Sequence, residues 1–282
     1  TAEEHATLAT AGTGTSRFLV EPRTNYLVGR LQQDLFKGNS NVGVLATAMN
    51  RASSGAAYTG GIDWNLFWHD NTYQISGQVA GSRTTDFGSA HNGYAAHVEL
   101  GKPSGLVQGN IRYEALSPGF DINDLGFVPR VGTQALQAWL GPRQYKPFGP
   151  FRERDLDVNV RLGWNYDRLV YQKELSISPA LELKNYWWIW GGVTRRFQTL
   201  DDLDTRGGPP IERPASSSAW FGVGSDSRKS VSGDFNLDWE RNAEGSTWRS
   251  VSLQIEARPS TRVEFSLQPH YTRNNNDAQW VA

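Results

Sequence analysis

The stretch DLDVNVRLGWNY, residues 155–166, decides the fold class. Apolar and polar side chains alternate along it, which is the period of a strand with one apolar face and one polar face. The apolar set is Leu156, Val158, Val160, Leu162, Trp164 and Tyr166, and the polar set is Asp155, Asp157, Asn159, Arg161 and Asn165. The stretch therefore predicts a long strand that separates an apolar environment from a polar one.

The same alternation recurs along nearly the whole chain. Clear copies occupy residues 107–115, 231–240 and 262–271, and weaker copies occupy 25–36, 41–50, 57–68, 72–82, 90–100, 132–140, 168–183, 184–197, 217–225 and 247–257. Gly, Pro, Asn, Asp and Ser separate the runs, as they do at turns. We therefore predict an all-β chain of about fourteen strands.

The length of these runs favours a membrane-spanning architecture. Strands in soluble sandwiches have about 5 to 6 residues, whereas a tilted strand needs about 9 to 11 to cross a bilayer. We expect short connections at one end of the strands and long ones, at 116–131, 141–152 and 198–216, at the other end. Together these features predict an antiparallel up-and-down transmembrane β-barrel of about 14 or more strands.

Aromatic residues support this interpretation. The chain has 282 residues, of which 12% are aromatic, including 11 Trp, and 20% are charged. Trp64, Trp68, Trp164, Tyr166, Trp187, Trp239 and Tyr271 lie toward the ends of runs on the apolar parity. Membrane barrels carry aromatic girdles at those positions. In the alternative interpretation, these rings fill a large soluble core.

The two parities predict two surfaces. We expect lipid to contact the apolar residues Val158, Val160, Leu162, Phe235, Leu237, Phe265 and Leu267. We expect the lumen to contain the polar residues Asn110, Arg112, Glu114, Asp155, Asp157, Arg161, Asp234, Asp238, Arg262 and Glu264. Charges of both signs can pair across strands, and they argue against a strongly ion-selective pore. The lumen is then either purely structural or a passage for a polar solute.

Composition excludes several functions. The chain has no cysteine, which rules out thiolate metal sites, disulfides and cysteine nucleophiles. With 28 basic and 29 acidic residues it has no basic excess for a phosphate backbone, so we expect no nucleic-acid partner. No apolar run approaches the roughly 20 residues of a membrane-spanning helix.

Three stretches carry a family resemblance. They are VEPRTNYLVGRLQQDLFKGNSNVGVLATAMNR at 20–51, AAYTGGIDWNLFW at 56–68 and SPGFDINDLGFVPR at 117–130. Together they resemble the C-terminal barrel domain of a family of bacterial outer-membrane proteins labelled DUF5916. Members typically carry a family 9 carbohydrate-binding-like domain ahead of the barrel. Nothing in this chain resembles that domain, so sugar binding is not carried over.

The resemblance implies a bacterial outer-membrane β-barrel domain over residues 1–282. Its implied partners are the lipid bilayer and other outer-membrane or periplasmic proteins. The final residues, NNNDAQWVA, lack the terminal aromatic strand of such barrels, and the resemblance implies further strands on both sides. We therefore expect the strands near 25–36 and 261–272 to pair with each other or with segments outside this chain.

The loop sequence PGFDINDLGF contains a further motif, formed by Asp121, Asn123, Asp124 and Gly126. Its carboxylates and amide are suited to Asx-turns, and Gly119 and Gly126 are suited to positive φ. The motif predicts a compact inter-strand loop. A ligand role would require these groups to converge on a cavity.

No catalytic, cofactor or metal signature is present. The chain lacks HExxH, GxSxG and GxxxxGK[ST] motifs. The histidines are scattered, at positions 5, 69, 91, 97 and 270. Asp201, Asp202 and Asp204 are closely spaced, but without the pattern of an EF-hand, which favours a solvated acidic loop over a calcium site.

We therefore expect a non-enzymatic outer-membrane β-barrel that acts as an anchor, channel or assembly component, with no cofactor. One alternative is a soluble or surface carbohydrate-binding or carbohydrate-processing β-protein. A second is an outer-membrane hydrolase, for which no motif supplies a triad. Its candidate residues are Ser82, Ser232, His270 and Glu264.

Overall fold

The computed structural model of the chain describes residues 1–10, 14–52, 55–86 and 89–276. These residues form strands, turns and one short 3₁₀ turn, η1 (Phe36–Gly38). The prediction of an all-β chain is confirmed, because the described residues contain no α-helix. In this part of the chain no helix is long and apolar enough to cross a membrane.

Most strands belong to one 15-stranded sheet. They are β3 (Thr24–Leu35), β4 (Ser40–Arg51), β5 (Ala56–Trp68), β6 (Tyr73–Asp86), β7 (Ser89–Lys102), β8 (Val107–Leu116), β9 (Thr133–Gln144), β10 (Phe151–Asn165), β11 (Val170–Leu183), β12 (Trp188–Arg196), β15 (Ser216–Gly224), β16 (Val231–Asn242), β17 (Thr247–Ser260), β18 (Val263–Leu267) and β19 (His270–Asn275). From β3 to β18 each strand is hydrogen-bonded to the next in this list, and β19 also pairs with β17. The predicted antiparallel up-and-down order is confirmed.

Two hairpins lie outside this sheet, and the sequence pattern did not predict either. One is β1 (Glu4–Thr10) with β2 (Gly14–Glu21), and the other is β13 (Thr199–Asp201) with β14 (Ile211–Arg213). The run 262–271 is also broken in two. Its parts, β18 and β19, pair with consecutive segments of β17, and Pro269, which has no N–H to donate, lies at the break.

The hydrogen-bonded order is open at both ends. Within the described residues, β3 pairs only with β4, while β18 and β19 pair only with β17. The described residues do not show these edge strands paired with each other, so barrel closure is not shown. An unpaired edge strand exposes a row of N–H and C=O groups that can accept a further strand. Pairing with segments outside this chain stays a prediction.

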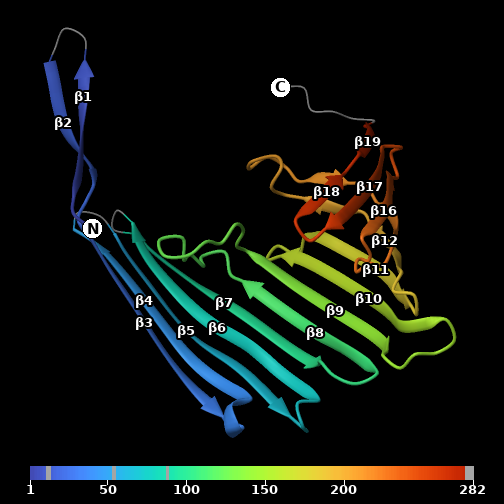
Figure 1. The fold of residues 1–282 in the computed structure, drawn as a ribbon. Helices are drawn as coiled ribbons and strands as arrows, with labels where there is room; N and C mark the ends of the chain where they lie inside the picture. Colours follow the sequence, from blue (N-terminus) through green and yellow to red (C-terminus); the bar gives the residue numbers. More distant parts are fainter. Residues whose placement is uncertain (11–13, 53–54, 87–88, 277–282) are drawn as a thin grey trace. The chain divides into compact units, whose positions relative to one another are not determined.

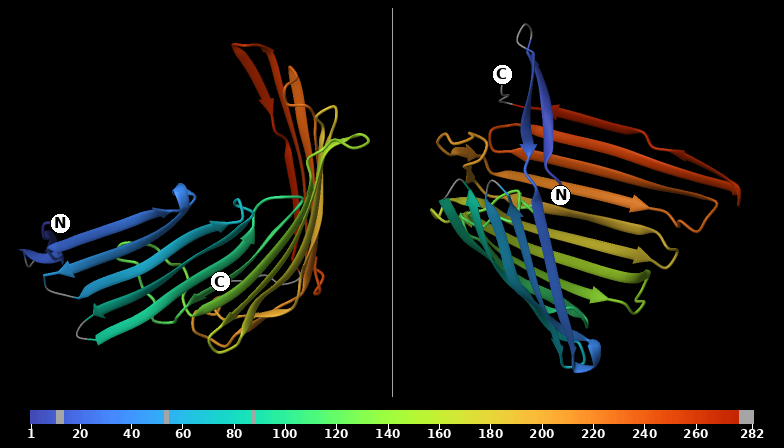
Figure 2. Two further views of the ribbon diagram at one scale, coloured as in Figure 1. Left: turned by 90° about the horizontal axis from the view of Figure 1, so that it is seen from below. Right: turned by 90° about the vertical axis from the view of Figure 1, so that its left-hand side faces the viewer.

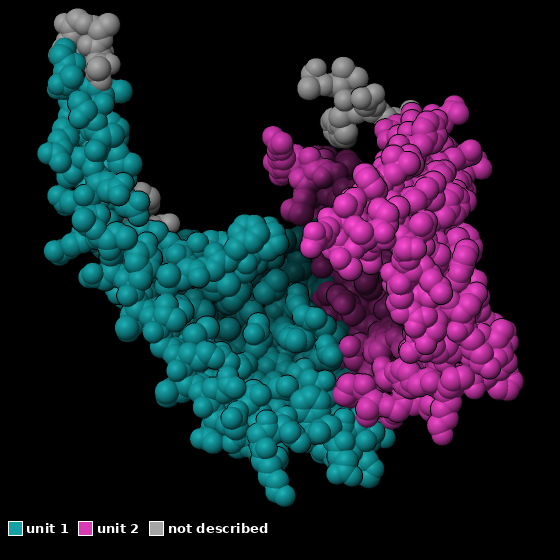
Figure 3. Space-filling model, viewed as in Figure 1, with its two compact units in different colours: residues 1–100, 112–134 teal, residues 101–111, 135–282 magenta. Residues whose placement is uncertain are grey.

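The chain divides into two compact units, which we describe separately (Figure 3). The first unit comprises residues 1–100 and 112–134, and the second comprises residues 101–111 and 135–282. Strands β3 to β6 lie side by side in the first unit (Figure 1). Long strands from β10 to β17 lie side by side in the second unit (Figure 2).

Long and short connections share an end of the second unit, which corrects the expected separation. At one end the connections span 166–169, 197–215 and 243–246. The connection 145–150 lies at the opposite end, although we expected it with the long loop 198–216. Three antiparallel strands, β10 to β12, separate these two connections, and an odd number of such strands places them at opposite ends. Strand β9 also continues to Gln144, which shortens the loop predicted from residue 141.

Candidate functional site

The strand registers sort the alternating residues of the second unit onto two faces. Phe221 pairs with Leu237, Leu237 with Val251 and Val251 with Tyr271 across four strands. One residue further along each strand, Gly222, Asn236, Ser252 and His270 form the equivalent row on the opposite face. We call these surfaces the apolar face and the polar face.

The first unit is two-faced in the same way. Val44 pairs with Ile62, which pairs with Val79, on the apolar face. Gly43 pairs with Asp63 on the polar face, where Arg30 donates hydrogen bonds to both Asp63 carboxylate oxygens at 3.0 and 2.9 Å. Each unit therefore has one mainly apolar face and one mainly polar face, as the sequence pattern predicts.

The large side chains of the apolar face are exposed. Phe221 is 47% exposed, Leu267 is 61% exposed and Leu31 is 79% exposed. Buried hydrophobic residues in the described part of the chain are limited to Met49, Ala57, Ala95, Ala115 and Phe120. A β-sandwich would instead bury its apolar face against a second sheet. The apolar face thus lacks the covering layer of a soluble core.

The pairing of residues between strands is known for β3 to β6 and for β10 to β19, leaving aside the β13–β14 hairpin. In these strands the described acidic residues lie on the polar face alone. The described acidic residues are Asp34, Asp63, Glu153, Asp155, Asp157, Glu174, Glu182, Asp234, Asp238, Glu240, Glu256 and Glu264. A surface without carboxylates is suited to an apolar solvent, in which an uncompensated charge is costly.

Several residues predicted for the lumen gather on the polar face of the second unit. Asn110, Asp157 and Arg161 line a polar pocket of about 520 Å³. There the Trp139 indole and the Arg143 guanidinium each donate a hydrogen bond of 2.6 Å to Asp157. The pocket can therefore contact a solute with both charged and aromatic groups.

A chain of ion pairs continues across the polar face. Glu174 accepts hydrogen bonds of 3.2 Å from Arg161 and from Arg196, and Arg196 also donates to Glu240 at 3.1 Å. Glu174, Arg196 and Glu240 line a second pocket of about 480 Å³. The sequence did not predict these ion pairs, because only the folded register brings the strands together.

The remaining predicted residues are dispersed. Asp155 lies 3.8 Å from Arg143 Nε, and Glu264 lies 3.6 Å from Arg258 Nε. In the first unit, Arg112 and Glu114 are 3.3 Å apart.

Three further residues complete the predicted set. Asp234 and Asp238 are on the polar face of β16, opposite Gln254 and Ser250 of β17. Arg262 lies in the turn before β18 rather than in a strand.

Tryptophans on the polar face were missed from the sequence. They are Trp139, Trp188, Trp190, Trp220 and Trp248. A Cβ at Gly222 would lie 2.2 Å from Trp190, and one at Gly192 would lie 2.3 Å from Trp220. Each of these two rings therefore covers a glycine of the neighbouring strand, which is a known way to support glycines in a sheet. The sequence signal that could have identified these residues was a tryptophan on the polar parity of one strand with a glycine on the neighbouring strand.

The connection between β8 and β9, residues 117–132, folds onto the polar face of the first unit, and we call it the inward loop. The Asp121 N–H donates a hydrogen bond of 2.9 Å to Ser82 Oγ on β6. Arg51 on β4 forms an ion pair of 2.5 Å with Asp124. Ile122 and other loop residues enclose a small cavity of about 110 Å³ with β4 and β5. These contacts attach the loop to β4, β5 and β6.

Two close backbone contacts set the position of the inward loop. A Cβ at Gly93 would lie 2.0 Å from the Phe120 nitrogen, and one at Gly119 would lie 2.3 Å from the Asn92 oxygen. Gly119 and Gly126 are not among the described residues with positive φ, so the predicted reason for these glycines was wrong. At Gly126 a Cβ would crowd Ile122 instead, at 2.9 Å.

The Asx-turn prediction holds for Asp121 alone, while Asn123 makes a longer-range side-chain contact within the loop. Asp121 Oδ1 accepts a hydrogen bond of 2.9 Å from the Asn123 N–H, and Asn123 Oδ1 accepts one of 2.9 Å from the Val128 N–H. Asp124 instead pairs with Arg51. These groups shape and anchor the loop, and they do not converge on one cavity.

The acidic loop of the second unit is organised by one arginine. Arg213 on β14 forms ion pairs of 2.6 Å with Asp201 and 2.7 Å with Asp204. The N–H groups of Asp204 and Leu203 also donate to Asp201 Oδ1, at 3.0 and 2.8 Å. These backbone hydrogen bonds, together with Arg213, lower the pKa of Asp201 to about 2. The Arg213 guanidinium thus lies where a calcium ion bound by Asp201 and Asp204 would lie.

The candidate hydrolase residues are not brought together. Ser82 Oγ accepts the loop hydrogen bond described above. In the second unit, Ser232 pairs with Glu256, whereas His270 pairs with Ser252, four residues away along β17. Among the described residues, no group of three or more His, Asp or Glu side chains is arranged to hold a metal ion.

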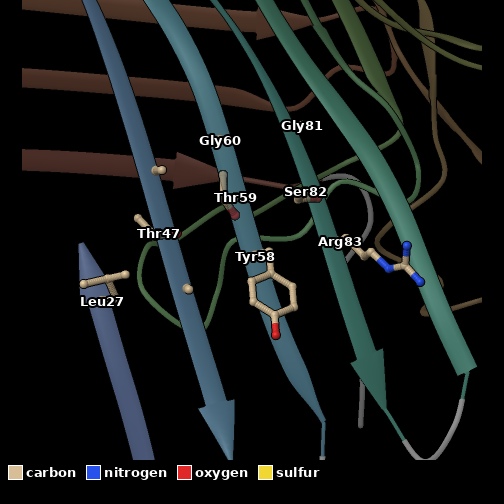
Figure 4. Close-up of a pocket in the computed structure, with 10 residues that line it drawn as sticks. Leu27, Thr47, Tyr58, Thr59, Gly60, Gly81, Ser82 and Arg83 are labelled. Atoms are coloured by element: carbon tan, nitrogen blue, oxygen red, sulfur yellow. The ribbon is translucent and has the colours of Figure 1, made fainter. Parts of the chain in front are cut away.

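A shallow pocket of about 500 Å³ lies on the apolar face of the first unit. Figure 4 shows Leu27 on β3 and Tyr58 on β5 beside it, together with Gly60 on β5 and Gly81 on β6. Small residues on β4 to β6 leave this space between the larger side chains. The pocket is a shallow depression in the apolar face rather than an enclosed site.

Comparison with known proteins gives one family. The model of a domain of unknown function, DUF5916, matches residues 1–282, which is the whole chain. No curated protein matches the chain.

Proposed function

The chain belongs to the DUF5916 family, and on this premise we propose that it forms a membrane-spanning β-barrel wall in a bacterial outer membrane, with its polar face lining a passage for polar solutes. The apolar face contacts lipid in this proposal. The inward loop narrows the passage beside the first unit. The protein acts by binding and guiding a solute rather than by catalysis.

The observation that carries this proposal is the exposed apolar face. Many of the exposed side chains on this face are large and apolar. The described acidic residues of β3 to β6 and β10 to β19 lie on the other face. Contiguous apolar patches of more than a few hundred Å² are rare on soluble monomers. Lipid is a solvent in which such a face is stable, and outer-membrane barrels carry an apolar band of this kind.

The positions of aromatic residues on the apolar face give independent support. The cross-strand row of Trp239 on β16 contains Val158 on β10 and Arg273 on β19. Trp164 lies six residues beyond Val158 toward one end of the strands, and Tyr271 lies two residues from Arg273 toward the other end. From β10 to β19, six strand-to-strand steps, the rings therefore shift by eight residues in one direction.

Such a shift is expected when rings on tilted strands lie at one depth. With about 3.3 Å per residue and about 4.8 Å between strands, the shift corresponds to a strand tilt of about 40°. Strands of outer-membrane barrels tilt by about 35 to 45°. The rings thus fit a girdle at one membrane–water interface.

The polar face is suited to a wide range of polar solutes. Arginines and carboxylates of this face pair with each other, so neither sign of charge dominates. The inward loop is held by an ion pair and by glycine contacts, which makes it a fixed constriction rather than a loose cover. We therefore propose that the passage discriminates only weakly between solutes of different charge and that the inward loop excludes large solutes.

Detergent dependence tests this proposal. The purified chain should stay monodisperse only in detergent or in lipid, and it should float with phosphatidylcholine vesicles on a density gradient. Resistance of the floated protein to alkaline extraction separates insertion from surface binding. A chain that is a monodisperse monomer in buffer without detergent would overturn the proposal.

A barrel also has to close, because unpaired edges are costly in hydrocarbon. Strand β3 and the β18–β19 edge must then pair with each other or with further strands. The chain has no native cysteine, so single cysteines at Leu31 and Leu267, one on each edge, give a clean cross-linking pair. Cross-links within one chain indicate closure by the chain itself, and cross-links between chains indicate pairing with a second copy.

A further inference from the structure

Five basic residues lie on the apolar face of the second unit, near one end of its strands. They are Lys173, Arg195, Arg241, Arg249 and Arg273, and we call them the basic band. All five are exposed. They belong to five different strands, β11, β12, β16, β17 and β19. Most other side chains of that face are apolar, and a further charged residue, Arg154, lies near the opposite end of the strands. The five residues therefore form a cluster at one margin of the face.

The register makes the basic band continuous. Arg195 pairs with Ser217, and Ser217 pairs with Arg241. Arg241 pairs with Thr247, which is two residues from Arg249, and Arg249 pairs directly with Arg273. Strands are about 4.8 Å apart, so neighbouring members of the band are within reach of one extended molecule or of adjacent headgroups.

The basic band follows the same slope as the aromatic rings. Arg195 pairs with Leu175. Lys173 is two residues from Leu175, toward the end of the strands that carries the connection 166–169. Arg249 and Arg273 lie one row further inward than Arg241. The band thus shifts by four residues over the five strand-to-strand steps from β11 to β19. This slope corresponds to a tilt of about 30° and has the same direction as that of the rings.

Two members of the band, Arg241 and Arg273, lie directly outside an aromatic ring. Arg241 follows Trp239 by two residues on β16, and Arg273 follows Tyr271 by two residues on β19. Two residues on a strand tilted by about 40° correspond to about 5 Å of depth. A girdle of rings at the interface therefore places these guanidinium groups at the level of lipid headgroups.

The members of the basic band have no acidic partners among the described residues. Arg195 donates a hydrogen bond of 2.8 Å to Ser217 Oγ, and its guanidinium lies 6.0 Å from the ring centre of Phe197. Lys173 lies 5.1 Å from the same ring. Arginines of the polar face, such as Arg161 and Arg196, are by contrast ion-paired.

One contact within the band is unfavourable without a bound anion. Arg249 and Arg273 are directly opposite each other on adjacent strands. Like charges in this position destabilise a sheet. An anion between the two guanidinium groups removes the repulsion, and guanidinium binds phosphate through paired hydrogen bonds.

We propose that the basic band binds the phosphate groups of anionic membrane lipids. The inference rests on the proposed function, because it requires lipid at the apolar face. The acyl chains lie against the apolar residues inside the band, and the phosphates lie between its arginines. This contact fixes the depth and orientation of the sheet in one leaflet.

A lipid titration of the detergent-solubilised chain tests the proposal. Native mass spectrometry counts bound phosphatidylglycerol and, separately, phosphatidylcholine with the same acyl chains. The test variant carries Arg241→Gln, Arg249→Gln and Arg273→Gln. The control variant carries Lys146→Gln, Lys184→Gln and Lys229→Gln, three exposed lysines in turns at the opposite end of the same strands. Both variants change the net charge equally.

The test variant should bind phosphatidylglycerol roughly a hundredfold more weakly, since each basic side chain near an anionic surface contributes about a fivefold factor. Its binding of phosphatidylcholine should be unchanged, which shows that it is folded. The control variant should match the unmodified chain. Equal binding by the test variant, or an equal loss in the control, would overturn the proposal, as would displacement of the lipid by inorganic phosphate at equal concentration.

Flotation with pure phosphatidylcholine vesicles separates this inference from the proposed function. If the unmodified chain inserts but does not prefer phosphatidylglycerol, the basic band is not a lipid site and the barrel proposal stands. If the chain does not insert, both proposals are wrong.

Discussion

Arginine substitution at Val160 is the most informative perturbation of the two faces. Val160 is on the apolar face of β10, and its partner on β11 is Leu175. It lies four residues inward from Trp164, which corresponds to about 13 Å along the strand and, at a tilt of about 40°, to about 10 Å of depth below the ring. An outer-membrane barrel has an apolar band about 25 Å tall, so Val160 lies close to its middle.

Val160→Arg should therefore lower the free energy of unfolding by about 2 to 4 kcal/mol, the cost of an arginine near the bilayer midplane. Asn159→Arg is the matched control, because Asn159 is the neighbouring residue on the polar face, opposite Ser176. It should cost less than about 1 kcal/mol, since water or paired charges surround it. Denaturant unfolding in phosphatidylcholine vesicles, followed by tryptophan fluorescence, measures both. Equal costs at the two positions would refute the assignment of the faces.

Three further predictions concern the inward loop, the polar face and the acidic hairpin. Gly93→Ala should increase hydrogen exchange in the inward loop, because the new Cβ would overlap its backbone, whereas Gly81→Ala, with its nearest atom at 3.9 Å, should not. Glu174→Gln should cost about 1 to 3 kcal/mol of stability, since its side chain is 12% exposed and two arginines would lose their charged partner. Glu240→Gln, at a side chain that is 38% exposed, should cost less than about 1 kcal/mol. The pKa of Asp201 is lowered from 3.8 to about 2, so this carboxylate should stabilise the hairpin above pH 3.8 and lose that effect as the pH falls through about 2. Hydrogen exchange of the β13–β14 hairpin against pH measures this, and Asp201→Asn should abolish the pH dependence.

The strands of the sheet could be predicted because the pattern that defines them is local. Alternation at 155–166 gave β10, and the other runs gave the remaining long strands within a few residues. Hairpin β1–β2 was missed because its runs are short and their polarity does not alternate cleanly. Barrel closure could not be settled by the pattern, because it depends on what pairs with the edge strands rather than on the composition of any one strand.

The candidate site was only partly predictable, because its contacts join residues far apart in the sequence. Parity alone placed Asp157 and Arg161 on the polar face. It could not show that Arg51 would meet Asp124, since that contact spans 73 residues and depends on the path of the inward loop. The basic band was likewise hidden, because its slope exists only in the register of neighbouring strands.

Spin labelling along β16 tests the central claim, that lipid contacts the apolar face, most directly. Single cysteines at Asp234, Phe235, Asn236 and Leu237 carry nitroxide labels in the chain reconstituted into phosphatidylcholine vesicles. Collisions with oxygen, which concentrates in lipid, and with a water-soluble nickel complex are measured at each site. The account predicts high oxygen accessibility at 235 and 237 and high nickel accessibility at 234 and 236. Equal nickel accessibility at all four positions would contradict it.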